Sequence, residues 1–303
     1  MDKLQWLKER QKGIGGSDVG AIMGLNKWKT AFQVYLEKTE PITEENQQSE
    51  AAYWGTQLED MVAKEFTIRS GKKVRRDTRH FVHKDYPFMV ANIDRRVVGE
   101  NAVLECKTVN QFGSKEWSGE EIPDSYLLQV QHYLAVTGAE IGYIACLIGG
   151  QHFIWKQVER DEELINLIIK AEKEFWSMVV NKTPPALDGS SAAEKWLNEK
   201  YKNSEEGLEI NLDTSYSDKL KKYNELKDKE QDVKEQLKEI ENQIKNEMGK
   251  AEIAHIPNFQ VTWKQVFSNR TDTNKLKSEY KDVYESCLKK TTSRRFTVKE
   301  VIA

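Results

Sequence analysis

The sequence has few cysteines and no long apolar segment. Its 303 residues include only three cysteines, Cys106, Cys146 and Cys287, which are widely separated and odd in number. This pattern excludes a disulfide framework and a Cys-x-x-Cys metal site. No window approaches the roughly 20 apolar residues that a membrane span needs, and the first residues lack the apolar core of a signal peptide. These absences predict a soluble protein of a reducing, cytoplasmic compartment with no membrane partner.

The sequence also lacks an excess of basic residues. It has 46 Lys and Arg residues against 49 Asp and Glu residues, a formal net charge of -3. Many DNA-binding domains are basic, so the overall balance alone argues against a nucleic-acid partner. The balance is uneven, however, because residues 251–303 carry ten Lys and Arg against six Asp and Glu. Phosphate contact needs local basic groups rather than a basic average, so the overall charge does not exclude DNA.

What is present in the first 185 residues is the pattern of one α/β unit. Hydrophobic spacing and end signals predict helices over residues 2–11, 30–38, 49–70, 124–136 and 161–181. Runs rich in β-branched and aromatic residues occur between residues 72 and 109 and between residues 141 and 158. The order of helices, antiparallel strands, a crossover helix and further strands predicts an α/β fold of the α+β type, with a mixed central sheet flanked by helices.

Beyond residue 185 the composition becomes more polar and more charged. At 31% charged and 38% hydrophobic residues, the chain must contain a solvated, charge-rich extension. Residues 186–210 are interpreted as a linker, and residues 211–303 as a C-terminal helical arm with a small β-containing tail. Apolar residues follow a 3-4 spacing in the arm: Leu220, Tyr223, Leu226, Val233, Leu237, Ile240 and Ile244. This stripe fits a coiled coil or helical arm, and equally a surface helix that folds back on its own domain.

A hairpin in the α/β unit is predicted to bring three charged residues to one face. A two-residue turn at residues 99–100, with glycine in its first position, suits a type II′ hairpin. The resulting register places Asp94 opposite Glu105. Side chains alternate along a strand, so Lys107 shares the face of Glu105 while the side chain of Cys106 points away.

This cluster has a chemical use. Asp94 and Glu105 could hold a hard cation such as Mg²⁺, which prefers oxygen ligands and retains water. Such a cation would polarise a phosphate oxygen and acidify a bound water, while Lys107 could orient that water or offset charge at phosphorus. The alternative is an ordinary exposed hairpin with cross-strand charge pairs. The bare spacing does not decide between them.

Several sequence blocks around the hairpin resemble one nuclease family. The spacing of Asp94, Glu105 and Lys107 is the PD-(D/E)xK nuclease signature, although ANID stands where its name would place Pro-Asp. The segments WLKERQKGIGGSDVGAIMG, GTQLEDMVAKEF and SYLLQVQHYLAVTG resemble, in the same order, the YqaJ-like viral recombinase family, relatives of lambda exonuclease. The similarity covers roughly residues 4–160. It implies a restriction-endonuclease-like core.

The resemblance also implies roles for residues at matching positions. Asp94 and Glu105 are the implied metal-binding carboxylates and Lys107 the implied catalytic lysine, with Mg²⁺ as cofactor and Mn²⁺ as a substitute. The main-chain carbonyl of Cys106 is a further implied metal ligand. Glu59 resembles a helix-borne acid that contacts the metal, often through water, although it could also be a solvated helix residue.

The crossover helix contributes further candidates. Gln129 matches the glutamine of a QxxxY motif in related nucleases and could position water or the scissile phosphate by hydrogen bonding. Tyr133 lies four residues later on the same helical face and could equally be a core aromatic residue. Tyr126 matches an active-site tyrosine position of lambda exonuclease-like members. His132 is not expected to be catalytic, because carboxylates hold the metal and its face points elsewhere.

Arg10 and Ser17 are implied to form a second site. Their seven-residue separation matches an arginine and a serine that grip the terminal 5′-phosphate in the resembled exonuclease. A guanidinium offers bidentate phosphate contacts, Ser17 is expected at a helix start that favours anions, and Gly15 and Gly16 are expected to let the backbone approach the phosphate. The alternatives are a surface charge for Arg10 and a helix cap for Ser17.

The resemblance implies a metal-dependent deoxyribonuclease of phage or prophage recombination in the cytoplasm of a bacterial host. Such an enzyme digests double-stranded DNA ends in the 5′-to-3′ direction and leaves a 3′ single strand for a single-strand annealing recombinase. A homo-oligomer is implied, with a trimer as the form known in the family. The alternatives are an endonuclease on the same core and a non-catalytic DNA-binding or assembly module. No function follows for residues 211–303.

Overall fold

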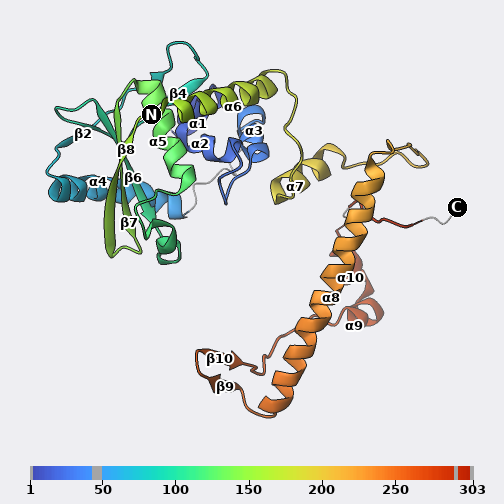
Figure 1. The fold of residues 1–303 in the computed structure, drawn as a ribbon. Helices are drawn as coiled ribbons and strands as arrows, with labels where there is room; N and C mark the ends of the chain where they lie inside the picture. Colours follow the sequence, from blue (N-terminus) through green and yellow to red (C-terminus); the bar gives the residue numbers. More distant parts are fainter. Residues whose placement is uncertain (1–2, 43–49, 290–292, 301–303) are drawn as a thin grey trace. The chain divides into compact units, whose positions relative to one another are not determined.

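The chain divides into two compact units, Met1–Trp196 and Leu197–Ala303. The computed structural model describes residues 3–42, 50–289 and 293–300 and is drawn in Figure 1. The boundary between the units falls inside the polar segment 186–210, which contains helix α7 (Ser191–Lys200). The segment that the sequence suggests as a linker is therefore partly helical.

The N-terminal unit is built around a five-stranded mixed sheet with helices packed against it (Figure 1). Its strand order is β2-β5-β6-β7-β8. Strands β6 and β7 are parallel, and the other neighbours are antiparallel. The strands are β2 (Val74–Arg76), β5 (Arg95–Val97), β6 (Ala102–Val109), β7 (Ile141–Ile148) and β8 (His152–Glu159). This mixed α/β architecture confirms the fold class predicted from the sequence.

The helices of this unit include all five that the sequence predicts. They are α1 (Lys3–Gln11), α3 (Ala31–Thr39), α4 (Glu50–Ser70), α5 (Asp124–Thr137) and α6 (Glu162–Val180). The short α2 (Gly16–Ile22) is the helix expected to start near Ser17, and the 3-10 helix η1 (Gln111–Trp117) is additional. The predicted starts at residues 2 and 49 lie outside the described residues. A second, small sheet has the order β1 (Ile14–Gly15), β4 (Met89–Ala91) and β3 (Phe81–Val82).

Helices α4 and α5 cover opposite faces of the five-stranded sheet. Phe66 of α4 lies in a buried cluster with Leu104 of β6, whereas Leu134 of α5 lies in a cluster with Val103 and Ile144. Burial of these apolar side chains is what holds the helices on the sheet. Successive residues of β6 thus face different helices, and the odd-numbered ones face α5.

Strands β5 and β6 form the hairpin that the sequence predicts. Arg95 pairs with Leu104, which is the register that places Asp94 opposite Glu105. Gly99 in the turn has a φ of 86°, a positive value that two-residue hairpin turns of this type require and that glycine adopts readily. The turn therefore fixes which side chains of the hairpin meet.

The C-terminal unit contains the predicted helical arm, α8 (Tyr216–Met248). The antiparallel strands β9 (Ile253–Ile256) and β10 (Phe259–Thr262) follow it, and then the short helices α9 (Thr273–Glu279) and α10 (Lys281–Ser286). Ion pairs such as Lys234–Glu230 and Lys245–Glu241 lie one turn apart along α8. The apolar stripe of α8 stays exposed, with Leu226, Val233, Leu237 and Ile240 each more than half accessible.

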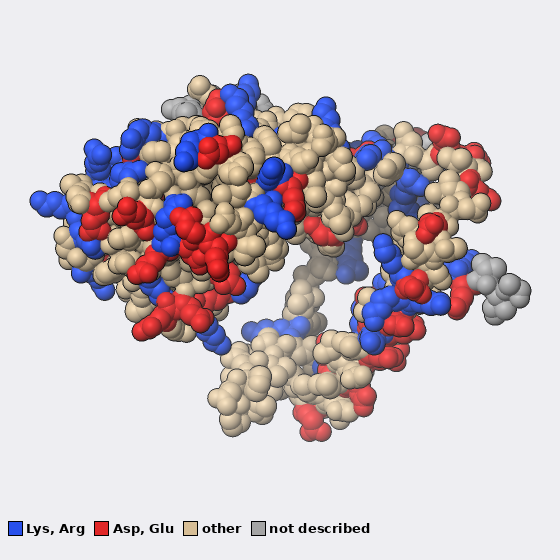
Figure 2. All heavy atoms as spheres, turned by 45° about the horizontal axis from the view of Figure 1, so that its top comes forward, with Lys and Arg blue, Asp and Glu red and all other residues tan. Residues whose placement is uncertain are grey.

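Both units carry acidic and basic side chains. On the face drawn in Figure 2, Lys and Arg side chains are interspersed with Asp and Glu. In the described part of the chain, no helix combines the length and apolar composition that crossing a membrane demands.

Candidate active site

Asp94 and Glu105 present two carboxylates where β5 and β6 pair. Asp94 Oδ2 accepts a hydrogen bond of 2.8 Å from the main-chain N–H of Cys106, which holds this carboxylate against β6. Glu105 is only 4% exposed, and its Oε2 is buried without a hydrogen-bond partner among the described residues. Burial raises the pKa of Asp94 well above its usual value, and the charges of Glu105 and Glu59 raise it further. Crowded carboxylates with an unsatisfied oxygen form an arrangement that a cation stabilises.

Lys107 and Gln129 complete a hydrogen-bonded cluster with Glu105. The Nζ atom of Lys107 lies 2.7 Å from Glu105 Oε1 and donates to Gln129 Oε1 at 2.9 Å. Gln129 Nε2 donates to the same Glu105 oxygen at 2.8 Å. Burial acts to lower the pKa of Lys107, but Glu105 and Asp94 outweigh it, so the pKa is raised. Lys107 is therefore a fixed positive charge at neutral pH.

Two tyrosines of α5 support this cluster. The ring of Tyr126 lies beneath the amine of Lys107, 5.0 Å from Nζ to the ring centroid, and contacts the ring of Trp117. The hydroxyl of Tyr133 accepts a hydrogen bond of 2.7 Å from Gln129 Nε2. Burial, with Glu105 next in effect, raises the pKa of Tyr133 well above its usual value. Tyr133 is thus a core aromatic residue that also helps to orient Gln129.

Glu59 reaches the site from α4 through an arginine. Arg95 Nη1 donates to Glu59 Oε1 at 2.5 Å and to the main-chain carbonyl of Asp94 at 2.6 Å, while its Nη2 contacts Asp60. Arg95 is a site residue that the sequence analysis missed, because no motif or spacing marks an arginine that will pair with a carboxylate of the site. The structure places Glu59 near Asp94, with its carboxylate paired to a cation of the protein.

The available oxygen donors fit a cation that keeps most of its water. Over the described residues, no three side chains from His, Cys, Asp and Glu converge closely enough to hold a metal by themselves. The side chain of Cys106 packs in the cluster beneath α4, and burial raises the pKa of its thiol. This leaves its main-chain carbonyl as the possible donor beside Asp94 and Glu105. Mg²⁺ is commonly held by one or two carboxylates and several waters, so this donor set suits it.

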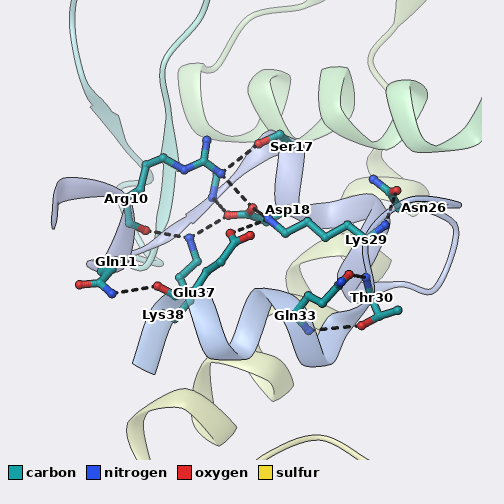
Figure 3. A network of polar contacts seen from close by, with 11 residues as sticks. Arg10, Gln11, Ser17, Asp18, Asn26, Lys29, Thr30, Gln33, Glu37 and Lys38 are labelled. Carbon is teal, nitrogen blue, oxygen red and sulfur yellow. Dashed lines mark hydrogen bonds and ion pairs between the residues drawn. The ribbon is translucent and has the colours of Figure 1, made fainter. Parts of the chain in front are cut away.

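Arg10 and Ser17, the predicted phosphate-binding pair, are brought together (Figure 3). Arg10 Nη2 donates to Ser17 Oγ at 3.3 Å and to Asp18 Oδ1 at 3.0 Å. Asp18 is fully buried and also forms ion pairs with Lys29 and Lys38. No role in this site is predicted for Asp18 from the sequence, since nothing in one sequence distinguishes a carboxylate that caps a helix from one that is buried among cations.

The start of α2 differs from the prediction. The N-cap residue is Gly15 rather than Ser17, and the Asp18 carboxylate accepts a 3.2 Å hydrogen bond from the Gly15 N–H. A Cβ atom on Gly16 would lie 2.6 Å from Tyr133 Cε1 and 3.1 Å from Gln129 Cγ. Close packing of α2 on α5, rather than room for a phosphate, therefore explains the glycine at position 16.

His132 lies on the side of α5 that faces away from the site, as predicted. One ring nitrogen lies 2.7 Å from Glu172 Oε1 and the other 2.9 Å from the carbonyl of Val90. Both His132 and Glu172 are fully buried. Burial acts to lower the pKa of His132, but Glu172 outweighs it and the pKa is raised. The pair ties α5 to α6 and to β4.

The fold and site are those of a mixed α/β protein with a carboxylate–lysine centre, and comparison with known proteins identifies its family. Residues 5–140 match the YqaJ-like viral recombinase domain. The chain is also 53% identical over 304 residues to the YqaJ protein of Bacillus subtilis (strain 168), covering 99% of this chain and 95% of that protein. The chain therefore belongs to the YqaJ-like viral recombinase family, as its sequence blocks predict.

Solved structures that are similar to part of the chain include those of two exonucleases. The alkaline exonuclease LHK-Exo from Laribacter hongkongensis matches with a TM-score of 0.49 and 18% identity, over 65% of this chain and 98% of that one. A phage-related exonuclease from Haemophilus somnus 129PT matches with a TM-score of 0.45 and 14% identity, over 58% of this chain and 99% of that one.

Proposed function

We propose that the protein is a metal-dependent deoxyribonuclease that digests duplex DNA from its 5′ ends and leaves 3′ single-stranded overhangs for recombination. The convergence of Asp94, Glu105, Lys107 and Gln129 in one cluster carries this proposal. Two carboxylates beside a fixed ammonium group suit phosphodiester hydrolysis, in which charge develops on phosphate oxygens. Membership of a viral recombinase family supports a substrate that recombination consumes, namely a DNA end.

Asp94, Glu105 and the main-chain carbonyl of Cys106 would hold Mg²⁺, or Mn²⁺ in its place, with Glu59 reaching it through water. When bound, such a cation polarises the phosphate and lowers the pKa of a coordinated water. The unsatisfied Oε2 of Glu105 and the raised pKa of Asp94 support this assignment. A positive charge between the carboxylates would lower the free-energy cost of the unpaired buried oxygen and the cost of ionising Asp94.

The protein's own groups then orient the phosphate and stabilise charge. Lys107 is protonated and held between Glu105 and Gln129, so it can donate to a phosphate oxygen without first changing position. Tyr126 supports the amine of Lys107 from below. Gln129 uses both ends of its amide on protein partners, and in this arrangement it positions Glu105 and Lys107 for the substrate.

Arg10 and Ser17 would bind the 5′-phosphate of the DNA end. Their side chains already contact each other, and α2, which carries Ser17, packs closely on α5 through Gly16. The spacing between the phosphate-binding pair and Gln129 is therefore fixed by close packing rather than by a loop. A fixed terminal-phosphate site favours an exonuclease over an endonuclease on the same core.

The C-terminal unit would serve assembly. The exposed apolar stripe of α8 supports a homo-oligomer or contact with a single-strand annealing protein, since exposed apolar surface of this kind marks interaction sites. Light scattering on the full chain measures its mass in solution. A trimeric mass supports the assembly implied by the family, whereas a monomeric mass contradicts self-assembly through α8.

Strand polarity on a linear duplex tests the proposal directly. One strand is labelled at its 5′ end in one substrate and at its 3′ end in the other, and each is incubated with Mg²⁺ or with EDTA. We expect rapid release of the 5′ label as a mononucleotide, gradual shortening of the 3′-labelled strand, and no reaction in EDTA. Nicking of covalently closed circular DNA at a comparable rate would favour the endonuclease, and intact DNA in every sample would favour a non-catalytic module.

A further inference from the structure

Beside the proposed 5′-phosphate site, the buried carboxylate of Asp18 contacts Arg10 and also two lysines that the function above does not use, Lys29 and Lys38. We propose that Lys29 is a third ligand of the terminal 5′-phosphate, and that Asp18 is the positioning residue that holds Lys29 next to Arg10 for this purpose. The inference rests on the proposed 5′-phosphate site and names two further residues of it. Figure 3 shows Asp18 at the centre of these contacts.

The outer oxygen of Asp18 joins the two cations. Asp18 Oδ1 accepts from Arg10 Nη2 at 3.0 Å and from Lys29 Nζ at 3.2 Å. Because both nitrogens bind one oxygen atom, they lie within about 6 Å of each other, close enough to donate to different oxygens of one phosphate. The side chains of Arg10 and Lys29 are 29% and 23% exposed, so a ligand can approach both.

The inner oxygen of Asp18 is used differently. Asp18 Oδ2 accepts from Lys38 Nζ at 2.8 Å and from the Gly15 N–H at 3.2 Å. The side chain of Lys38 is 2% exposed, and its amine also donates to the main-chain carbonyl of Arg10 at 2.7 Å. Lys38 therefore balances the buried charge of Asp18 and anchors α1, whereas Arg10 and Lys29, which are partly exposed, contact the other oxygen of Asp18.

The charge balance of the cluster favours a phosphate with more than one negative charge. Within the described part of this cluster, the three cations Arg10, Lys29 and Lys38 outnumber the two carboxylates of Asp18 and Glu37 by one. A terminal phosphate monoester carries about −1.5 to −2 charges at neutral pH, whereas an internal phosphodiester carries one. Two adjacent cations therefore distinguish a phosphorylated end from internal backbone.

Glu37 is a carboxylate that pairs with Lys29 from the solvent side of the cluster. Its Oε2 lies 2.6 Å from Lys29 Nζ, and its side chain is 50% exposed. A bound phosphate and Glu37 would compete for the same ammonium group. Removal of the Glu37 charge should therefore strengthen phosphate binding, while removal of the Lys29 charge should weaken it.

The test measures binding of the full-length protein to two short duplexes that differ only in a 5′-phosphate or a 5′-hydroxyl. Fluorescence anisotropy in EDTA reports affinity without cleavage, so the result does not depend on nuclease activity. Lys29→Gln should reduce the preference for the phosphorylated duplex roughly tenfold, the scale of one lost charged hydrogen bond. Glu37→Gln should increase it about two- to threefold, the scale of an exposed ion pair.

Lys12→Gln is the matched control, because Lys12 is 68% exposed and its ion pair among the described residues is with Glu9, outside the Asp18 cluster. It should leave the preference unchanged. Asp18→Asn should lower the preference, but it also leaves Lys38 buried without its partner, which is strongly destabilising. The double variant Asp18→Asn, Lys38→Met removes both buried charges and should fold, as a thermal melt will show, while still losing the preference.

The outcomes separate the two proposals. If the Lys29→Gln variant keeps the full wild-type preference for the phosphorylated duplex, or if Glu37→Gln lowers that preference, the role of Lys29 is overturned. The Arg10–Ser17 site is unaffected by either result. Retention of the full preference by the folded double variant overturns the positioning role of Asp18. No preference in the wild-type protein overturns the 5′-phosphate site itself, and the inference with it.

Discussion

Gln129 Nε2 donates a hydrogen bond of 2.8 Å to Glu105 Oε1, and this contact joins α5 to β6 at the centre of the candidate site. The same amide accepts from Lys107 at 2.9 Å, so one side chain fixes both an acid and a lysine. Helix α5 is in turn packed against α2 at Gly16. One helix therefore connects the proposed hydrolytic site with the proposed phosphate site.

Substitution of Gln129 should impair turnover more than binding. We expect Gln129→Ala to lower kcat about 10- to 100-fold with little change in KM, the scale seen when a residue that orients a metal ligand is removed. Gln131→Ala is the control, because Gln131 is equally buried on α5 but bonds to Glu159 and Asp161. It should lower stability without changing kcat of the folded protein. Equal kcat losses in the two variants would contradict the positioning role of Gln129.

Substitution of Gly16 should separate α2 from α5. A Cβ atom there overlaps Tyr133 and crowds Gln129, so Gly16→Ala should destabilise the protein by about 1–3 kcal/mol, as overpacking does, and also reduce activity. Gly55→Ala on α4 is the control, because its new methyl group meets only Thr108 Oγ1 at 3.6 Å. Because Gly55 lies inside a helix, replacing it by Ala should raise the free energy of unfolding by roughly 0.5–1 kcal/mol. Urea denaturation measures both, and equal effects would contradict the packing argument.

Mg²⁺ should stabilise the protein through Asp94. The folded-state pKa of Asp94 is raised by burial first and then by Glu105 and Glu59. For an acid this means that its contribution to stability falls as pH rises above the unfolded value of 3.8. Asp94→Asn should therefore raise Tm at pH 7.5 without metal, whereas Mg²⁺ should raise Tm only in the wild type. A Mg²⁺ shift of the same size in the variant would show that the cation binds elsewhere.

The buried pair of His132 and Glu172 should make stability decline on the alkaline side. Because Glu172 holds the pKa of His132 above its usual 6.5, the stabilisation is complete below pH 6.5 and is lost as pH rises through the folded-state value. Burial raises the pKa of Glu172 as well, so the pair retains the proton that joins it at neutral pH.

The double variant His132→Phe, Glu172→Leu tests this dependence, because apolar replacement of a buried pair is often neutral for stability. Urea denaturation from pH 6 to pH 9 should show a falling free energy of unfolding for the wild type and a flatter profile for the double variant. Parallel profiles would assign the pH dependence to other groups.

Local patterns predicted the hairpin well. A turn with glycine first and strict alternation along β6 were enough to place Asp94 opposite Glu105 and to turn the side chain of Cys106 away, and the observed register agrees. Both features depend on neighbours close in the sequence. The 3-4 spacing in α8 likewise predicted a long helix, although not how much of its stripe stays exposed.

Contacts between distant segments were not predictable in this way. Lys38 lies 20 residues from Asp18, and Glu59 lies 36 residues from Arg95. Each of these pairs forms only because packing of the helices and strands brings the partners together, and no periodicity marks them. The pairing of Arg10 with Ser17 came from resemblance to a family, and the cations that surround Asp18 came only from the structure.

In the function proposed above, the cluster around Asp94 hydrolyses phosphodiester bonds at DNA ends. The most direct measurement compares wild type, Asp94→Asn and Asp85→Asn on an end-labelled linear duplex with Mg²⁺, where Asp85 is an exposed carboxylate paired with Lys84. We expect wild type and Asp85→Asn to release nucleotides from 5′ ends at equal rates, and Asp94→Asn to be more than about 100-fold slower, since loss of a direct ligand should exceed loss of an outer one. Digestion by Asp94→Asn at the wild-type rate, or intact DNA with the wild type, would contradict the claim.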